Sequence, residues 1–145
     1  MKLSQKGLDF IKYFEGCKLK AYLDPAGIAT IGYGNTRIAR LGLKISSYQA
    51  EALLKEDIII KEAEINRLNL NLNQNQFDAI VSFVFNLGIG NLKRSTLYKL
   101  LQKNPNNFMI AFEFPKWRRA NGKVIPGLER RRKREAQMYF TGKGV

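Results

Sequence analysis

The sequence predicts an α+β fold, in which a small β-hairpin lobe near the N-terminus is joined by a long helix to a mainly α-helical lobe. Apolar residues recur at helical spacing through most of the chain, whereas residues 18–34 alternate in character and contain a turn. The 145 residues are the usual length of one domain. We therefore expect a single domain over residues 1–145, with the hairpin lobe at about 17–45 and the helical lobe at about 70–145 together with the N-terminal helix.

A first helix is expected to begin after Ser4, whose hydroxyl can cap it, and to stop at Gly16. Between these residues, apolar side chains recur at helical spacing at Leu8, Ile11 and Phe14. Glu15 is thereby placed at a helix C-terminus.

The segment that follows has the pattern of a β-hairpin. Apolar residues alternate with polar or aromatic ones along residues 19–23, and Asp24-Pro25-Ala26-Gly27 supplies turn chemistry before residues 28–33. Asp24 therefore falls on the turn and Thr30 on the returning strand. Gly32-x-Gly34 lacks the further glycine of a phosphate-binding loop, so we interpret it as tight packing of the hairpin.

The rest of the chain is predicted to be helical. Ser46 and Gln49 form a capping box for a helix of roughly twenty residues, which the Asn-rich stretch 69–75 ends. The next helix, up to Leu87, is apolar over much of its circumference and should lie at the centre of the larger lobe. Beyond it, separated by the turn-forming stretches 104–105 and 121–127, shorter helices are expected at Ser95–Lys103, Asn107–Glu113 and Leu128–Phe140.

Glu15 and Asp24 would both face the junction of the two lobes, where a cleft is the natural place for a ligand. Hydrolysis of a glycosidic bond needs an acid that protonates the leaving oxygen and a carboxylate that activates water or attacks the sugar. Glu15 follows Tyr13-Phe14, so partial burial would favour its protonated form, whereas Asp24 on an exposed turn would stay ionised. The hydroxyl of Thr30 could help Asp24 to hold the attacking water. Spacing alone proves little, because aspartate is common in turns.

Composition restricts the chemistry further. The 25 Lys and Arg residues against 12 Asp and Glu give a formal charge of +13, which favours polyanionic partners such as nucleic acid, anionic lipid or anionic wall polymer. Histidine is absent and Cys17 is the only cysteine, so ordinary zinc sites and histidine-activated nucleophiles lack their residues, and we expect no cofactor and no metal. Cys17 itself is interpreted as a small buried hydrophobe rather than a regulatory thiol.

Three separated blocks resemble the phage-type lysozymes, the endolysin muramidases of glycoside hydrolase family 24. The first runs from Glu15-Gly16-Cys17 through Asp24 and Gly27 to Thr30-Ile31-Gly32-Tyr33-Gly34, a Glu-x8-Asp-x5-Thr arrangement. The second is Asn86-Leu87-Gly88-x-Gly90-x-Leu92 with Ser95-Thr96-Leu97, and the third is Trp117 with Gly122-Lys123-Val124-x-Pro126-Gly127-Leu128-x-Arg130-Arg131-Arg132. Three blocks in order over nearly the whole chain are far more specific than any one motif.

The resemblance implies a lysozyme-like fold and a defined reaction. That reaction is hydrolysis, with inversion, of the β-1,4 bond between N-acetylmuramic acid and N-acetylglucosamine in bacterial peptidoglycan, which lyses the host cell. By position, the resemblance implies Glu15 as general acid, Asp24 as the second carboxylate and Thr30 as the water-orienting hydroxyl. Inversion would require the two carboxyl groups to lie roughly 6.5 to 9.5 Å apart, against about 5 to 5.5 Å for retention.

Candidates for substrate binding are Asn86, Tyr33 and Arg131. Asn86, at the end of the buried helix, could bond an N-acetyl group or simply cap that helix. The basic stretch from Lys116 to Arg134 could bind anionic wall polymer or form a solvated face. One arginine of the Arg130–Arg132 run could also approach Glu15 and bond to it as a partner.

Asn35 is a departure from the family, which commonly has histidine there. Any pH-dependent ion pair made by that histidine is therefore absent from this chain.

Two other function classes remain as alternatives. The charge, Trp117 and the arginine run would suit a nucleic-acid-binding module, although this leaves the segment from Glu15 to Thr30 unexplained. The basic C-terminal helix, which ends in Met138-Tyr139-Phe140, could contact anionic membranes and disrupt them. We expect peptidoglycan glycan strands as the partner, with no specific nucleic acid, and a monomeric protein.

The expected location follows from the N-terminus and the resemblance. Charges interrupt every apolar stretch of residues 1–16, so we expect neither a secretory signal nor a membrane span there. The resemblance then implies that the chain stays in the host bacterial cytoplasm until a separate pore-forming partner, a holin, releases it to the periplasm or cell wall at lysis.

Overall fold

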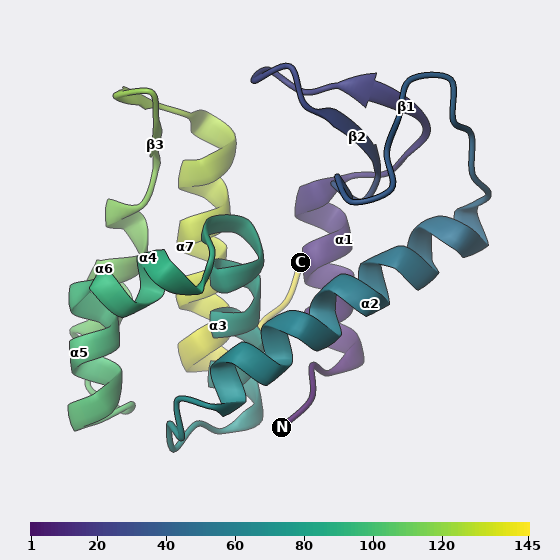
Figure 1. Ribbon diagram of the computed structural model, residues 1–145. Coiled ribbons are helices and arrows are strands. Elements are labelled where there is room, and N and C mark those ends of the chain that lie inside the picture. Colours follow the sequence, from purple (N-terminus) through teal and green to yellow (C-terminus); the bar gives the residue numbers. More distant parts are fainter.

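A computed structural model describes residues 1–145 and confirms the α+β architecture (Figure 1). The hairpin of β1 (Lys18–Leu23) and β2 (Ala29–Gly32) lies at one end of the molecule, and helix α2 (Ser47–Asn66) leads from it to the helical lobe. The other elements are α1 (Gln5–Glu15), α3 (Gln74–Leu87), α4 (Ile89–Arg94), α5 (Thr96–Lys103), α6 (Ile110–Glu113), the 3-10 helix η1 (Phe114–Lys116), β3 (Arg119–Ala120), β4 (Lys123–Val124) and α7 (Pro126–Thr141).

Helix α1 has the bounds that its caps predict. The Ser4 hydroxyl accepts a hydrogen bond from the Gly7 N–H at 3.1 Å, and the helix stops at Gly16, whose φ is 66°. A fully buried carboxylate of α3 ties down this first turn, because Asp78 accepts hydrogen bonds from both the amide (3.0 Å) and the hydroxyl of Ser4. Since an α-helix is a stiff rod, anchoring its start also restricts where its last residue, Glu15, can lie.

The hairpin pairs as predicted and gains a third segment. Its strands are antiparallel, with Tyr22 opposite Thr30. Residues 43–45 then add to the outer edge of β1 through two backbone hydrogen bonds of 2.9 and 3.0 Å, which the alternation pattern did not reveal. The lobe is therefore wider than a bare hairpin.

The hairpin lobe is joined to α2 by a buried amide. Asn35, 3% exposed, donates from Nδ2 to Oδ2 of Asp57 at 3.0 Å, and its Oδ1 accepts the Ile38 N–H. Arg37 binds the other oxygen of the same carboxylate at 2.8 Å. The Asp57 carboxylate thus binds one neutral partner, Asn35, and one charged partner, Arg37, both from the loop after β2.

Helix α3 is the buried centre of the helical lobe, as its apolar circumference predicts. Every residue from Gln76 to Val84 is buried. The helix packs against α7, α1 and α2, which surround it in Figure 1. Burial on all sides accounts for the mostly apolar character of this stretch, and its polar residues Asp78 and Ser82 are hydrogen-bonded inside the protein.

Beyond α3, the structure differs from the sequence prediction in four places. The helix expected at Asn107–Glu113 is the shorter α6, which begins at Ile110. Helix α4 follows α3 directly after Gly88, where no helix was expected, and α7 begins at Pro126 rather than at Leu128. The predicted loop around Asn121-Gly122 is the turn of a small β3–β4 hairpin, with φ of 51° and 77° at these two residues. Positive φ at two successive turn residues is the conformation that an Asn-Gly pair adopts most easily.

Helix α7 does not present the apolar membrane-facing end suggested by its sequence. Met138 and Tyr139 are 0% and 2% exposed, because that face of the helix packs into the core. The Tyr139 hydroxyl donates to the Pro105 carbonyl at 2.6 Å. None of the helices combines the length and apolar character needed to cross a bilayer.

Candidate active site

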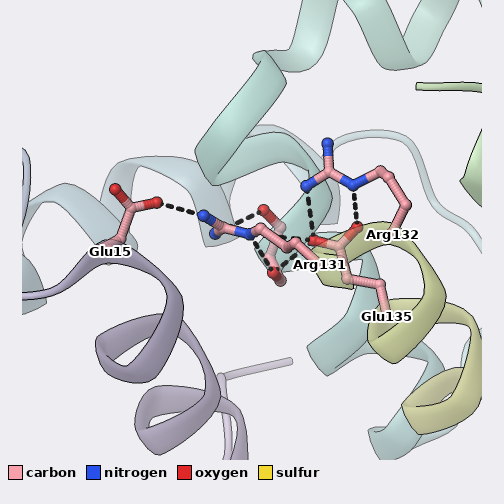
Figure 2. A network of polar contacts seen from close by, with 5 residues as sticks. Glu15, Arg131, Arg132 and Glu135 are labelled. Carbon is pink, nitrogen blue, oxygen red and sulfur yellow. Dashed lines mark hydrogen bonds and ion pairs between the residues drawn. The ribbon is translucent and has the colours of Figure 1, made fainter. Parts of the chain in front are cut away.

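Glu15 lies at the C-terminal end of α1, with its side chain 17% exposed. Its Oε2 accepts a hydrogen bond from Nη1 of Arg131 on α7 at 2.5 Å, as Figure 2 shows. Arg131 also lies over the Phe14 ring, with its guanidinium carbon 5.8 Å from the ring centroid. Of the three consecutive arginines, the structure therefore brings Arg131 against Glu15.

A hollow of about 400 Å³ opens beside this pair, between the ends of α1 and α3 and the start of α7. Glu15, Asn86, Arg130 and Arg131 contribute its polar groups, and apolar side chains line the rest. A few polar groups converging on an apolar hollow are typical of a small-molecule site. Asp24 and Tyr33 do not line this hollow.

Asn86 has a buried side-chain oxygen with no hydrogen-bond partner. The Asn86 side chain does not cap α3. The carbonyl of Leu87 at the end of that helix instead accepts a hydrogen bond from Nδ2 of Asn91 at 2.6 Å. An unpartnered buried polar atom is costly and calls for an explanation such as a missing ligand contact. Asn86 also lines the hollow beside Glu15 and Arg131.

Asp24 and Thr30 are linked through one residue of the hairpin turn, Ile28. Oδ1 of Asp24 accepts the backbone N–H groups of Ala26 and Ile28 at 2.9 and 2.8 Å. The Thr30 hydroxyl, in a residue only 4% exposed, donates to the Ile28 carbonyl at 2.9 Å. Oδ2 of Asp24 accepts no hydrogen bond from the protein, so one carboxylate oxygen is positioned by the turn and the other is free.

Tyr33 and Cys17 lie near each other beside α1. Burial raises the pKa of the Tyr33 phenol, and the neighbouring Cys17 adds to the rise. The Lys12 ammonium lies 5.9 Å from the Tyr33 ring centroid and is paired with Glu51 of α2 at 2.9 Å. Cys17 is exposed, which corrects the expectation of a buried hydrophobe.

Behind Arg131 lies a charged network that no sequence motif indicated (Figure 2). Glu135, fully buried on α7, accepts hydrogen bonds at Oε2 from the Ser82 hydroxyl (2.5 Å) and from Nη2 of Arg132 (3.0 Å). Its Oε1 forms an ion pair of 2.6 Å with Nε of Arg132, without hydrogen-bond alignment. Burial lowers the pKa of the Arg132 guanidinium, and Glu135 opposes that effect.

Comparison with known proteins identifies the family. The sequence pattern of the phage lysozyme family matches residues 12–135, which include Glu15, Asp24, Thr30 and the Arg130–Arg132 run. The chain belongs to the phage lysozyme family.

Individual relatives agree with this assignment. The chain is 44% identical over 144 residues to an endolysin of Acyrthosiphon pisum secondary endosymbiont phage 1, covering 96% of this chain and 98% of that protein. It is 41% identical over 147 residues to an endolysin of Bacillus phage B103, covering 98% of this chain but only 55% of that longer protein. It also superimposes on the endolysin from Escherichia coli O157:H7 phage FAHEc1 with a TM-score of 0.92 and 40% identity, covering 100% of this chain and 97% of that one.

This phage lysozyme homologue is therefore a peptidoglycan-hydrolysing endolysin and a glycoside hydrolase. None of these matches favours the nucleic-acid-binding alternative.

Gly34 offers a test of how closely the hairpin lobe approaches the acid. A Cβ at this position would lie 3.1 Å from Oε1 of Glu15, and its φ is +79°. We expect Gly34→Ala to displace the carboxylate and slow wall lysis on the order of tenfold, since small misplacements of reacting groups are costly. The positive φ should also lower the free energy of unfolding by about 1 kcal/mol. Rates of turbidity loss with purified peptidoglycan and urea denaturation measure the two effects.

Gly122→Ala is the matched control, because its φ is +77° and a Cβ there meets nothing within 4 Å. It should show a similar loss of stability with unchanged lysis. Equal lytic rates for both variants would show that the contact with Glu15 does not matter.

Proposed function

We propose that this endolysin cuts the β-1,4 bond between N-acetylmuramic acid and N-acetylglucosamine, with Glu15 as general acid and Asp24 as the second carboxylate. The contrast between the two carboxyl groups supports this proposal. Glu15 is half-buried beside Phe14 in a hollow lined by α1, α3 and α7, whereas Asp24 sits on the hairpin turn with Oδ2 free. Two carboxyl groups in different environments are what acid-base cleavage of a glycoside requires.

Asp24 and Thr30 would together hold the attacking water. The Thr30 hydroxyl proton is engaged by the Ile28 carbonyl, so its oxygen lone pairs are left to accept a hydrogen bond. A water that donates one proton to Thr30 and the other to Oδ2 of Asp24 has its own lone pair directed away from both. As this water attacks the anomeric carbon, Asp24 takes its proton and Glu15 protonates the leaving oxygen.

We also propose roles for the remaining candidates. Asn86, which lines the hollow and has an unpartnered side-chain oxygen, would bond an N-acetyl group. Arg131 is only 4% exposed and is engaged by Glu15, so its contribution to substrate binding would be made together with that carboxylate. Tyr33 would contact the substrate from the hairpin side. The 145 residues would work as one domain and as a monomer.

The Glu15→Gln variant tests the assignment of the acid. It keeps the size of the side chain but removes the proton donor, and general acid catalysis contributes roughly a hundredfold or more to such reactions. We expect the rate of peptidoglycan hydrolysis to fall by at least that factor, measured as reducing ends released from purified walls. Glu129→Gln, which removes an acid from α7 outside the proposed catalytic pair, should retain activity.

Unchanged hydrolysis by Glu15→Gln would rule out the proposed acid. Salt-sensitive DNA binding should be the same in the wild type and in Glu15→Gln, because the basic residues from Lys116 to Arg134 are left in place. Lysis of intact cells by purified Glu15→Gln would reveal membrane disruption as a separate activity of the basic surface.

The stereochemistry of the product tests the role of Asp24. With water activated by Asp24 on the face opposite Glu15, we propose inversion, so the first sugar product released from the β-linked substrate should be the α anomer. Proton NMR of soluble peptidoglycan fragments, recorded within minutes of adding the enzyme, distinguishes the anomers. A β product would instead indicate a retaining mechanism with a covalent intermediate.

We propose further that the chain waits in the host cytoplasm and reaches the periplasm or cell wall through a holin. The membership in a family of phage endolysins supports this, because peptidoglycan lies outside the cytoplasmic membrane. Expression in a bacterial host with and without a co-expressed holin is the test. Lysis should require the holin, and prompt lysis without it would overturn this route.

A further inference from the structure

We propose that Glu135 is a positioning residue that sets both the place and the charge balance of Glu15, acting through Arg131. The inference rests on the proposed role of Glu15 as general acid. Glu135 cannot touch a substrate, because it has no exposed surface. Its effect must therefore pass through the side chains around it.

The geometry of the network connects Glu135 to the acid in one step. Glu135 lies one turn after Arg131 on α7, and its Oε2 is 3.4 Å from Nε of Arg131. Arg131 then reaches Glu15 with its far end, Nη1, at 2.5 Å. Figure 2 shows the guanidinium spanning the gap between α7 and the end of α1. One planar group thus touches both carboxylates.

Ser82 of α3 locks that planar group in place. Nε of Arg131 donates to the Ser82 hydroxyl at 3.3 Å, and Nη2 donates to the Ser82 carbonyl at 3.3 Å. The same hydroxyl donates to Glu135 at 2.5 Å. With Nε and Nη2 held from behind, the fork geometry of the guanidinium leaves Nη1 aimed at Glu15. The acid is therefore oriented by a group that is itself fixed.

Glu135 also balances the charge behind the acid. Two buried guanidinium groups, Arg131 and Arg132, lie close enough to Glu15 to act on it electrostatically. Without Glu135 they would face one carboxylate and hold Glu15 in its ionised form, whereas a general acid must carry a proton. With Glu135 present, two buried cations face two carboxylates, so Glu15 is not the only counter-ion.

The other charged groups around Glu15 do not replace this balance. On the hollow side, Arg130 is exposed to solvent. On α1 itself, Lys12 is paired with Glu51 of α2 and lies beside the Tyr33 ring. The approach from the hairpin lobe is made by the uncharged backbone of Gly34. Glu135 is therefore the carboxylate that offsets the arginines.

Glu135→Gln removes the charge and keeps the shape. We expect kcat on soluble peptidoglycan oligosaccharides to fall on the order of tenfold with KM within about twofold, because an acid held ionised loses transition-state stabilisation rather than substrate binding. The alkaline limb of the activity profile should move to lower pH. Both assays are run below the melting temperature measured for the variant, since Arg132 loses a buried partner.

Ser82→Ala separates position from charge, because it removes the shared hydroxyl and leaves all four charges in place. We expect a several-fold lower kcat with little change in the pH profile. Glu129→Gln is the control for the loss of one acid from α7 and should leave kcat and the pH profile as in the wild type. If Glu135→Gln does not fold, an unchanged kcat in Ser82→Ala overturns the proposal.

A double-mutant comparison tests whether the effect passes through Arg131. In an Arg131→Met background, Glu135→Gln should cause a much smaller further loss of kcat than in the wild type, because the group that connects the two carboxylates is gone. Fully additive effects, or a wild-type pH profile for Glu135→Gln, would overturn the positioning role. That result is distinct from failure of the proposed function, which would show as activity retained by Glu15→Gln.

Discussion

Two buried guanidinium groups on α7 set the main constraint on this structure. Arg132 is fully buried and Arg131 is 4% exposed, and a charge taken out of water is costly unless carboxylates and hydrogen bonds surround it. The carboxylates come from α7 itself and from the end of α1, 116 positions away from Arg131 in sequence. The ion pair that neutralises Arg131 therefore joins the end of α1 to α7. The proposed catalytic acid, Glu15, is at the same time part of the structural framework.

The two proposed catalytic carboxyl groups are supported in different ways. Glu15 depends on tertiary structure, because α1 is tied at its start by Asp78 of α3 and at its end by Arg131 of α7. Asp24 depends on local structure, since its partners are the backbone amides of Ala26 and Ile28 in its own turn. A rigid helical lobe thus carries one reacting group and a short turn carries the other.

Sequence reasoning succeeded where the signal is local. The cap at Ser4, the stop at Gly16 and the capping box at Ser46 are interactions over three or four residues, and the helices they delimit have the expected bounds. The Asn121-Gly122 turn also carries a local signal, but its strands have only two residues each, too few to show alternation. Helix α4 has only six residues, and its one buried apolar residue, Leu92, depends on packing that periodicity cannot show.

For the site, family resemblance indicated the residues and the structure supplied their contacts. Choosing Arg131 among the three arginines requires knowing which face of α7 meets α3. That face begins with charged residues, so hydrophobic periodicity does not identify it as the buried face. Glu135 was missed for the same reason. The hydrogen bond between Asn35 and Asp57 also bears on how the joint between the lobes responds to pH. Asn35 joins the hairpin lobe to α2 through an amide, which carries no charge at any pH. The donor side of that joint therefore does not change its charge when the medium becomes mildly acidic, whereas a histidine in its place would gain one.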